Sequence, residues 1–211
     1  NLFGSTAFYG NFRGARLRGA NLGSATLVNS DFALADLTGA TLVRANLQGV
    51  FLYGANLTGA NLYLSTLTNA DLPYAVLPYA NLMATNANGV ELARANLFGA
   101  DLRFAYLASA DLAEADLRGA DLTGADLTGA DLTGANLSDA NLYGANLTNT
   151  NLTDATLTRS NLYLATTTGA YMEDAGPRRS KLSLSTMDST TRYWAMRSGT
   201  GIQTANISNP D

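Results

Sequence analysis

The chain has 211 residues, among them 20 Gly but no His and no Cys, and its formal net charge is −4. Without imidazole or thiolate groups, the usual zinc, haem and iron–sulfur ligand sets are excluded, and so are disulfides. The one lysine, Lys181, leaves the first 180 residues without a Schiff-base amine or a phosphate-loop lysine. We therefore expect no enzyme activity, no cofactor and no metal site.

Charge is divided unevenly along the chain. Residues 1–175 carry eight basic and fifteen acidic side chains, a balance of −7, whereas residues 176–211 carry five basic and two acidic, a balance of +3. The acidic part argues against direct nucleic-acid binding, which needs a basic footprint on phosphate. Polar residues interrupt every apolar stretch, so no membrane span of about 18 apolar residues is expected. These features predict a soluble protein.

Residues 1–175 divide into thirty-five consecutive pentapeptides without insertion or deletion. The clearest copies, from Ala115 to Asn149, read ADLRG ADLTG ADLTG ADLTG ANLSD ANLYG ANLTN. The central position is Leu in 29 of 35 copies, and the position two residues earlier is always small. A period of five fits neither a helix nor a strand. We expect a coil of equal straight sides that turns Leu and Ala inward and leaves Asp, Asn and the two variable residues facing water.

The second variable position indicates how many sides each coil has. Sampled every twenty residues from Asn29, it holds only Asn, Gly or Ser, which suit turns with positive φ. The series that starts at Ser24 is far less restricted. This difference predicts four sides and twenty residues per coil. Phe12 and Phe32, which occupy the central position, should then stack on one another.

The repeated A(D/N)LXX pattern resembles that of the pentapeptide-repeat proteins and covers about five-sixths of the chain. This resemblance implies an all-β fold, a right-handed quadrilateral parallel β-helix with four pentapeptides per coil. Residues 1–175 would form a solenoid of about nine coils, roughly 40 Å long at ~4.8 Å per layer. Residues 176–211 would form a non-repeat C-terminal tail. Within it, Tyr193, Trp194 and Met196 are expected either to cap the last coil or to dock a partner subunit.

Aromatic side chains at outward positions of the repeat predict an interface, because exposed Tyr and Phe are enriched at protein contacts. Ordinary surface decoration is the alternative. The candidate residues are Phe51, Tyr53, Tyr74, Tyr79, Phe104 and Tyr106. A basic cluster of Arg13, Arg16 and Arg18 is interpreted as a solvated face or as a docking site for an acidic partner or anionic lipid head groups.

Acidic residues twenty positions apart should stack on one face. Asp71, Glu91, Asp111 and Asp131 form such a series, at intervals of about 5 Å. Retaining glycosidases separate their two carboxyl groups by a similar distance. A convex rod offers no cleft, however, so we interpret these residues as solvated repeat positions, with a cation-binding ladder as the alternative.

Together these patterns predict a non-enzymatic scaffold that mediates protein–protein interaction, with a protein partner of unknown identity. The resemblance implies a cyanobacterial or chloroplast source and a role as accessory or assembly subunit of a larger photosynthetic complex. Peripheral docking to a membrane complex and a homodimer through an end of the rod stay open. The chain starts at Asn1 rather than Met, which fits a cytoplasmic protein with a trimmed terminus and equally a thylakoid-lumen or periplasmic protein that has lost a targeting segment.

The resemblance also implies one alternative function, a DNA-mimicking modulator of DNA gyrase. The acidic repeat region fits this role loosely. Neutral Asn or Thr at most outward Asp positions, the uninterrupted repeats and Leu rather than Phe at the central position argue against it.

Overall fold

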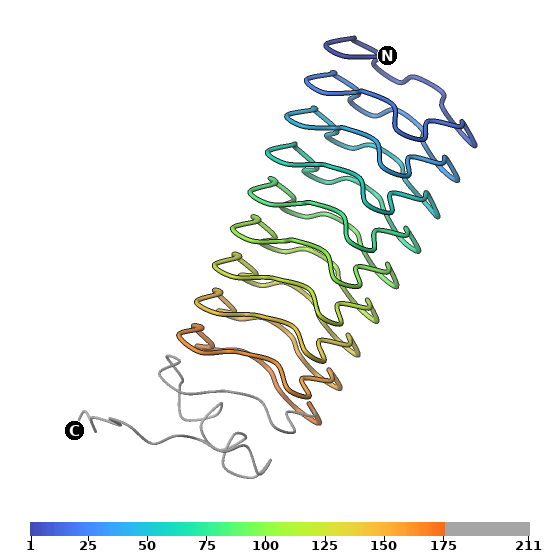
Figure 1. Ribbon diagram of the computed structural model, residues 1–211. Coiled ribbons are helices and arrows are strands. Elements are labelled where there is room, and N and C mark those ends of the chain that lie inside the picture. Colours follow the sequence, from blue (N-terminus) through green and yellow to red (C-terminus); the bar gives the residue numbers. More distant parts are fainter. Residues whose placement is uncertain (176–211) are drawn as a thin grey trace, which may run out of the picture.

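The computed structural model describes residues 1–175, which form a right-handed quadrilateral parallel β-helix (Figure 1). Each strand is reduced to one pairing residue per side. Parallel bridges join residue i to residue i + 20, from Thr6 with Thr26 to Asn151 with Tyr171. The four-sided coil of twenty residues is therefore confirmed.

The four sides are numbered here in chain order. The coil that begins at Asp101 has Asp101 as pairing residue on its first side, Tyr106 on its second, Asp111 on its third and Asp116 on its fourth. Every other coil in residues 1–175 repeats this arrangement, and successive coils lie directly on one another (Figure 1).

Backbone hydrogen bonds explain why the residue before each Leu is usually Asp or Asn. Asp121 N donates to the preceding coil at 2.9 Å, Leu122 N and Gly124 N donate to the following coil at 2.7 and 2.9 Å, and Ala125 N donates to Leu122 O at 3.0 Å. The N–H of Thr123 has no backbone acceptor in this pattern, and it donates instead to Asp121 Oδ1 at 3.0 Å. The Asp or Asn thus caps the corner as an Asx turn and is half-buried, not simply solvated as the sequence pattern suggested.

Every corner in residues 1–175 places its third residue in the left-handed region, with φ between 53° and 69°. All of these corners but one also make the i→i+3 hydrogen bond, as in a type II turn. The exception is the corner that ends at Gly10, whose N–H donates to Ser30 Oγ at 3.0 Å. Four sides and twenty residues per coil are as the Asn29 series predicted, but positive φ is not the reason, because the Ser24 series has it as well. Within the Asn29 series, an Asn side chain lies against the Gly of the next coil, and Asn69 Oδ1 is only 2.5 Å from where a Cβ on Gly89 would be.

The interior consists of stacked Leu and Ala columns. From Leu22 to Leu162, the Leu side chains at the central position are at most 2% exposed. Phe12 and Phe32 stack as predicted, with ring centroids 4.5 Å apart and planes inclined by 12°. Polar exceptions are satisfied internally at Thr85 and Thr150, whose hydroxyl groups donate to backbone carbonyls. No helix in residues 1–175 has the length and apolar character needed to cross a membrane.

Candidate interaction surface

Five exposed aromatic side chains lie on the third side or at the two corners that border the fourth side. We call them the aromatic patch: Phe51, Tyr53, Tyr74, Tyr79 and Phe98, each between 36% and 65% exposed. Tyr53 and Tyr74 meet edge to face at the corner that leads into this side, with ring centroids 5.7 Å apart. Tyr79 and Phe98 meet edge to face at the next corner, 5.5 Å apart. The side chains that the sequence assigned to adjoining sides of one coil thus border the same side.

Phe98 was not among the residues predicted from the sequence. It lies at the corner position of Pro78, one coil further along, and the twenty-residue register brings it against Tyr79. That register was available from the sequence. Because Phe98 follows Tyr79 by 19 residues, a search of the neighbouring coils finds it only if it includes both variable positions of each corner.

Two prolines shape this part of the surface. Pro73 and Pro78 stand where the corner needs a negative φ, which the pyrrolidine ring already provides. Proline has no N–H, so these corners need no Asx acceptor, and the pairing residue before Pro78 is accordingly Val76. Asp71 precedes Pro73, and its Oδ1 is buried without a hydrogen-bond partner. Burial raises the pKa of Asp71 above its usual range.

Arg94 fixes one edge of the aromatic patch. Its guanidinium lies over the Tyr74 ring, 5.8 Å from the centroid, and Nη1 donates to the Tyr74 hydroxyl at 2.7 Å. The same group makes two hydrogen bonds of 2.9 Å to the Glu114 carboxylate, which hold the pKa of Glu114 below its usual range. Tyr74 is therefore held in place before any partner binds.

Arg118 holds the opposite edge in the same way. It lies 5.5 Å over the Phe98 ring and pairs with Asp116, the acid of its own repeat, at 2.7 Å. The hydrogen bonds from Arg118 lower the pKa of Asp116. Both cations next to the aromatic patch are thus already neutralised by a neighbouring carboxylate.

The third side carries an uncompensated row of acids, which we call the acidic stripe: Asp71, Glu91, Asp111 and Asp131. The bridges between successive members confirm that they stack, as predicted. Within residues 1–175, no Arg lies within ion-pair distance of any of them. In the same part of the chain, no three acidic side chains are grouped closely enough to hold a metal ion.

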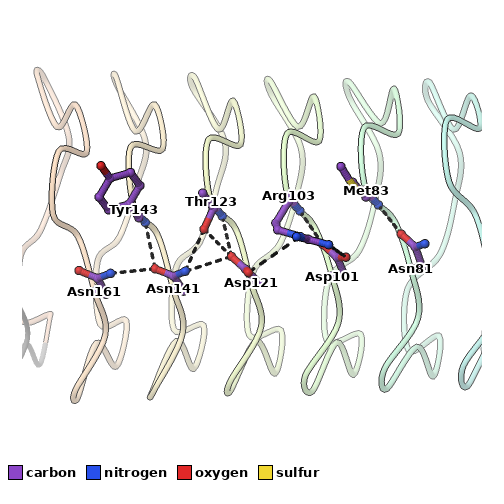
Figure 2. A network of polar contacts seen from close by, with 9 residues as sticks. All are labelled: Asn81, Met83, Asp101, Arg103, Asp121, Thr123, Asn141, Tyr143 and Asn161. Carbon is purple, nitrogen blue, oxygen red and sulfur yellow. Dashed lines mark hydrogen bonds and ion pairs between the residues drawn. The ribbon is translucent and has the colours of Figure 1, made fainter.

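The first side shows the contrasting arrangement (Figure 2). Arg103 binds both carboxylate oxygens of Asp101, at 2.8 and 2.7 Å, and lies 4.0 Å from Asp121 of the next coil. Asp121 Oδ1 also accepts the Thr123 hydroxyl at 2.6 Å and the Asn141 amide at 3.2 Å. Polar groups on this side therefore satisfy one another along the rod.

The other predicted aromatics lie apart from the aromatic patch. Phe104 is at the corner between the first and second sides, where its ring leans over Gly124. Tyr106 is the pairing residue of the second side, and Asn88 Oδ1 accepts the N–H of Ala108 in its place. Both rings are about half exposed, at 52% and 54%.

The predicted basic cluster lies in the first coil. Arg13 and Arg18 approach acids of the next coil, Asp31 at 3.8 Å and Asp36 at 3.5 Å. Arg16 lies between them in the sequence, and its backbone forms a parallel β-bridge with Asp36. The remaining candidates lie outside the described residues: Tyr193, Trp194 and Met196.

The sequence matches the family model for pentapeptide repeats in eight copies that together extend over residues 10–174. Among solved structures, HetL, a protein involved in heterocyst differentiation regulation from the cyanobacterium Nostoc sp. strain PCC 7120, is 33% identical; the alignment covers 82% of this chain and 89% of HetL, with a TM-score of 0.41. QnrB1, a plasmid-mediated fluoroquinolone resistance protein, is 18% identical over 91% of this chain and 95% of its own, with a TM-score of 0.50. A pentapeptide repeat protein from the Arabidopsis thaliana thylakoid lumen is 26% identical. The alignment covers 73% of this chain and 84% of the Arabidopsis protein, with a TM-score of 0.19. No curated protein gave a significant match.

Proposed function

The chain belongs to the pentapeptide-repeat family, and on that premise we propose that it is a non-enzymatic rod that docks a protein partner. One observation carries the proposal, the aromatic patch, in which five exposed rings gather on neighbouring coils at positions where the repeat most often has Asp, Asn, Thr or Gly. Tyr and Phe dominate the binding energy of many interfaces, whereas repeated small polar residues contribute little. Under this proposal the rod serves as an accessory or assembly subunit of a larger complex, for example a photosynthetic complex.

The rod supports this function through rigidity. Each coil is tied to its neighbours by backbone hydrogen bonds on every side, and Arg94 and Arg118 hold two of the five exposed rings. A surface whose side chains are already ordered loses little conformational entropy when it binds. The convex outer faces also suit contact with another protein better than enclosure of a small substrate.

The proposal is tested by gentle purification of the native protein with its partner, followed by binding measurements with the purified components. The variant Tyr74→Gly with Tyr79→Gly removes two rings at corners with φ of 57°, where Gly is readily accommodated. We expect affinity for the partner to fall by about tenfold or more, as for loss of interface anchors. The matched control replaces Tyr143 and Tyr163, a stacked pair at the corner after the first side, with Thr.

The control variant should bind as the unmodified protein does. Unchanged affinity of the Tyr74→Gly, Tyr79→Gly variant, with its thermal stability preserved, would remove the aromatic patch as the docking site.

One observation, the acidic stripe, favours a second candidate function: a DNA-mimicking modulator of DNA gyrase. Stacked carboxylates present negative charge along the rod, as a duplex backbone does. Inhibition of DNA supercoiling by the protein, and its loss in a variant with Glu91→Gln, Asp111→Asn and Asp131→Asn, would support this candidate. If the protein leaves the supercoiling reaction unaffected, the gyrase candidate is rejected and the scaffold proposal is unchanged.

A further inference from the structure

We propose that the docking segment of the partner is a basic amphipathic helix that lies along the third side of the rod. This inference rests on the proposed function and specifies the partner's chemistry. The apolar end of the helix contacts Phe51, Tyr53 and Tyr74. Its Lys or Arg residues follow the acidic stripe over Glu91, Asp111 and Asp131.

Charge complementarity identifies the partner as basic. Each acid on the first and fourth sides lies within 4.0 Å of an Arg. In the Asp101–Arg103 and Asp116–Arg118 pairs the Arg belongs to the same repeat, whereas Asp36 and Asp121 approach an Arg of the preceding coil. At the corner beside the stripe, Arg94 is already bound to Glu114. The carboxylates of the stripe stack one coil apart with no such compensation among residues 1–175. Basic side chains of a partner would relieve their mutual repulsion, and like charges would be rejected.

The apolar part adjoins the stripe on the same side. Phe51 is the pairing residue directly before Asp71, and Tyr53 and Tyr74 lie at the corner next to it. Asp71 marks the boundary, because its Oδ1 is buried and without a donor. Going from Phe51 to Asp131, the third side therefore changes from apolar to acidic in one direction along the rod.

The spacing of the stripe favours a helix over an extended segment. Coils stack at ~4.8 Å, so the three carboxylates from Glu91 to Asp131 span roughly 10 Å. Basic residues one turn apart on a helix repeat at about 5.4 Å, and three of them span about 11 Å. Alternate residues of an extended strand repeat at about 6.7 Å and fall out of register. A helix aligned with the rod thus places one cation near each carboxylate.

The test uses a synthetic helical peptide that carries Trp and Leu in its first turn and three Lys residues at successive turns of one face. Binding to the full-length protein is measured by fluorescence anisotropy at low and moderate salt. One control peptide has the same composition with the Lys residues on the opposite face, and another is held extended by prolines. We expect only the first peptide to bind tightly, with an affinity that weakens as salt increases.

Two protein variants with the same change in net charge separate the stripe from the rest of the surface. The stripe variant carries Glu91→Gln, Asp111→Asn and Asp131→Asn, and Asn is the alternative that the repeat itself uses. The control variant carries the change to Asn at three acids on the first and second sides: Asp101, Asp121 and Asp126. We expect about tenfold weaker binding and a flatter salt dependence for the stripe variant, and less than about twofold change for the control.

The apolar contact is tested by restoring residues typical of the repeat, with Phe51→Asn, Tyr53→Thr and Tyr74→Gly. This variant should weaken peptide binding by about tenfold or more while the salt dependence stays as in the unmodified protein. Equal effects of the stripe and control variants, or equally tight binding of the extended peptide, would overturn the inference. Dimerisation that the stripe variant abolishes would also overturn it and would assign the third side to a second copy of the chain.

The native partner distinguishes failure of this inference from failure of the proposed function. Suppose that the partner's affinity depends on Tyr74 and Tyr79 but not on the acidic stripe. The rod would then still be a docking protein, and only the basic helix would be wrong. If neither variant changes the partner's affinity, both proposals are wrong.

Discussion

Replacing Pro73 with Thr is expected to stabilise the rod, because it supplies donors that Asp71 lacks. In the unmodified chain, Asp71 Oδ1 is buried without a partner, and Pro73 has no N–H to donate. The equivalent corner formed by Asp121 and Thr123 shows the expected result. There the carboxylate accepts the backbone N–H at 3.0 Å and the hydroxyl at 2.6 Å.

The magnitude follows from two opposing contributions. A buried acceptor without a partner destabilises the folded state by about 1–3 kcal/mol, which the new hydrogen bonds should recover. Losing a proline at a compatible position raises the entropy of the unfolded chain and costs about 0.4–1 kcal/mol. The free energy of unfolding should therefore increase by roughly 0.5–2 kcal/mol, measured as a higher midpoint of urea unfolding with an unchanged slope.

The same substitution at the next corner is expected to act in the opposite direction. Pro78 follows Val76, which has no side-chain acceptor, so Pro78→Thr introduces an N–H without an Asx partner. Losing the proline adds to this cost, and the free energy of unfolding should fall by roughly 1–3 kcal/mol. A change of the same sign at Pro73 and Pro78 would refute the role assigned to the Asx acceptor.

The effect of pH gives a second test of the same reasoning. Burial raises the pKa of Asp71 above the reference value of 3.8, so the folded state disfavours its ionised form. The resulting loss of stability is absent well below pH 3.8 and fully developed once the pH exceeds the raised pKa. The stabilisation by Pro73→Thr should therefore be small near pH 3 and largest at neutral pH. A larger gain at acidic pH would contradict the assignment.

Three further substitutions test the packing of the rod by urea unfolding. Leu122→Asp should reduce the free energy of unfolding by more than about 4 kcal/mol, because it buries a charge in the Leu column, and a change below ~1 kcal/mol would contradict the inward position. Gly89→Ala should cost more than Gly119→Ala, since both have positive φ but only the Gly89 Cβ would collide with Asn69, and equal losses would argue against that contact. Thr123→Val should cost about 1–2 kcal/mol by removing a hydroxyl that links two coils, and no loss would show that this network is replaced by water.

The five-residue period was sufficient to predict the interior, because Leu and small residues recur at positions that no helix or strand could bury together. It also predicted the stacking of Phe12 on Phe32 and the alignment of the acids on the third side. These features depend only on register. Once one coil has twenty residues, any two residues twenty apart must be neighbours.

Features that depend on individual hydrogen bonds were not predicted. The repeat pattern predicted only that Asp and Asn face water. Their side chains instead accept the one N–H of each corner that has no backbone acceptor, as Asp121 does for Thr123. For the same reason, the link between Pro78 and its preceding Val76 escaped notice. Phe98 was missed because its contact with Tyr79 joins two different corner positions of successive coils.

Because the interior of the rod is regular, departures from the repeat on its outer surface can be recognised one residue at a time. Since every coil must keep the same interior, most of the variation between copies of the repeat lies at the outward positions and the corners. There, six of the eight Arg residues within 1–175 lie within 4.0 Å of a carboxylate, as in the Arg103–Asp101 and Arg159–Asp139 pairs. Between Phe51 and Asp131 the third side departs from that pattern twice. Phe51 lies beside the exposed rings of the next corner, and the four carboxylates that follow have no Arg within ion-pair distance among residues 1–175. Neither departure is required by the fold, because Asn and Gly occupy the same positions elsewhere. The partner recognition that we propose would account for both.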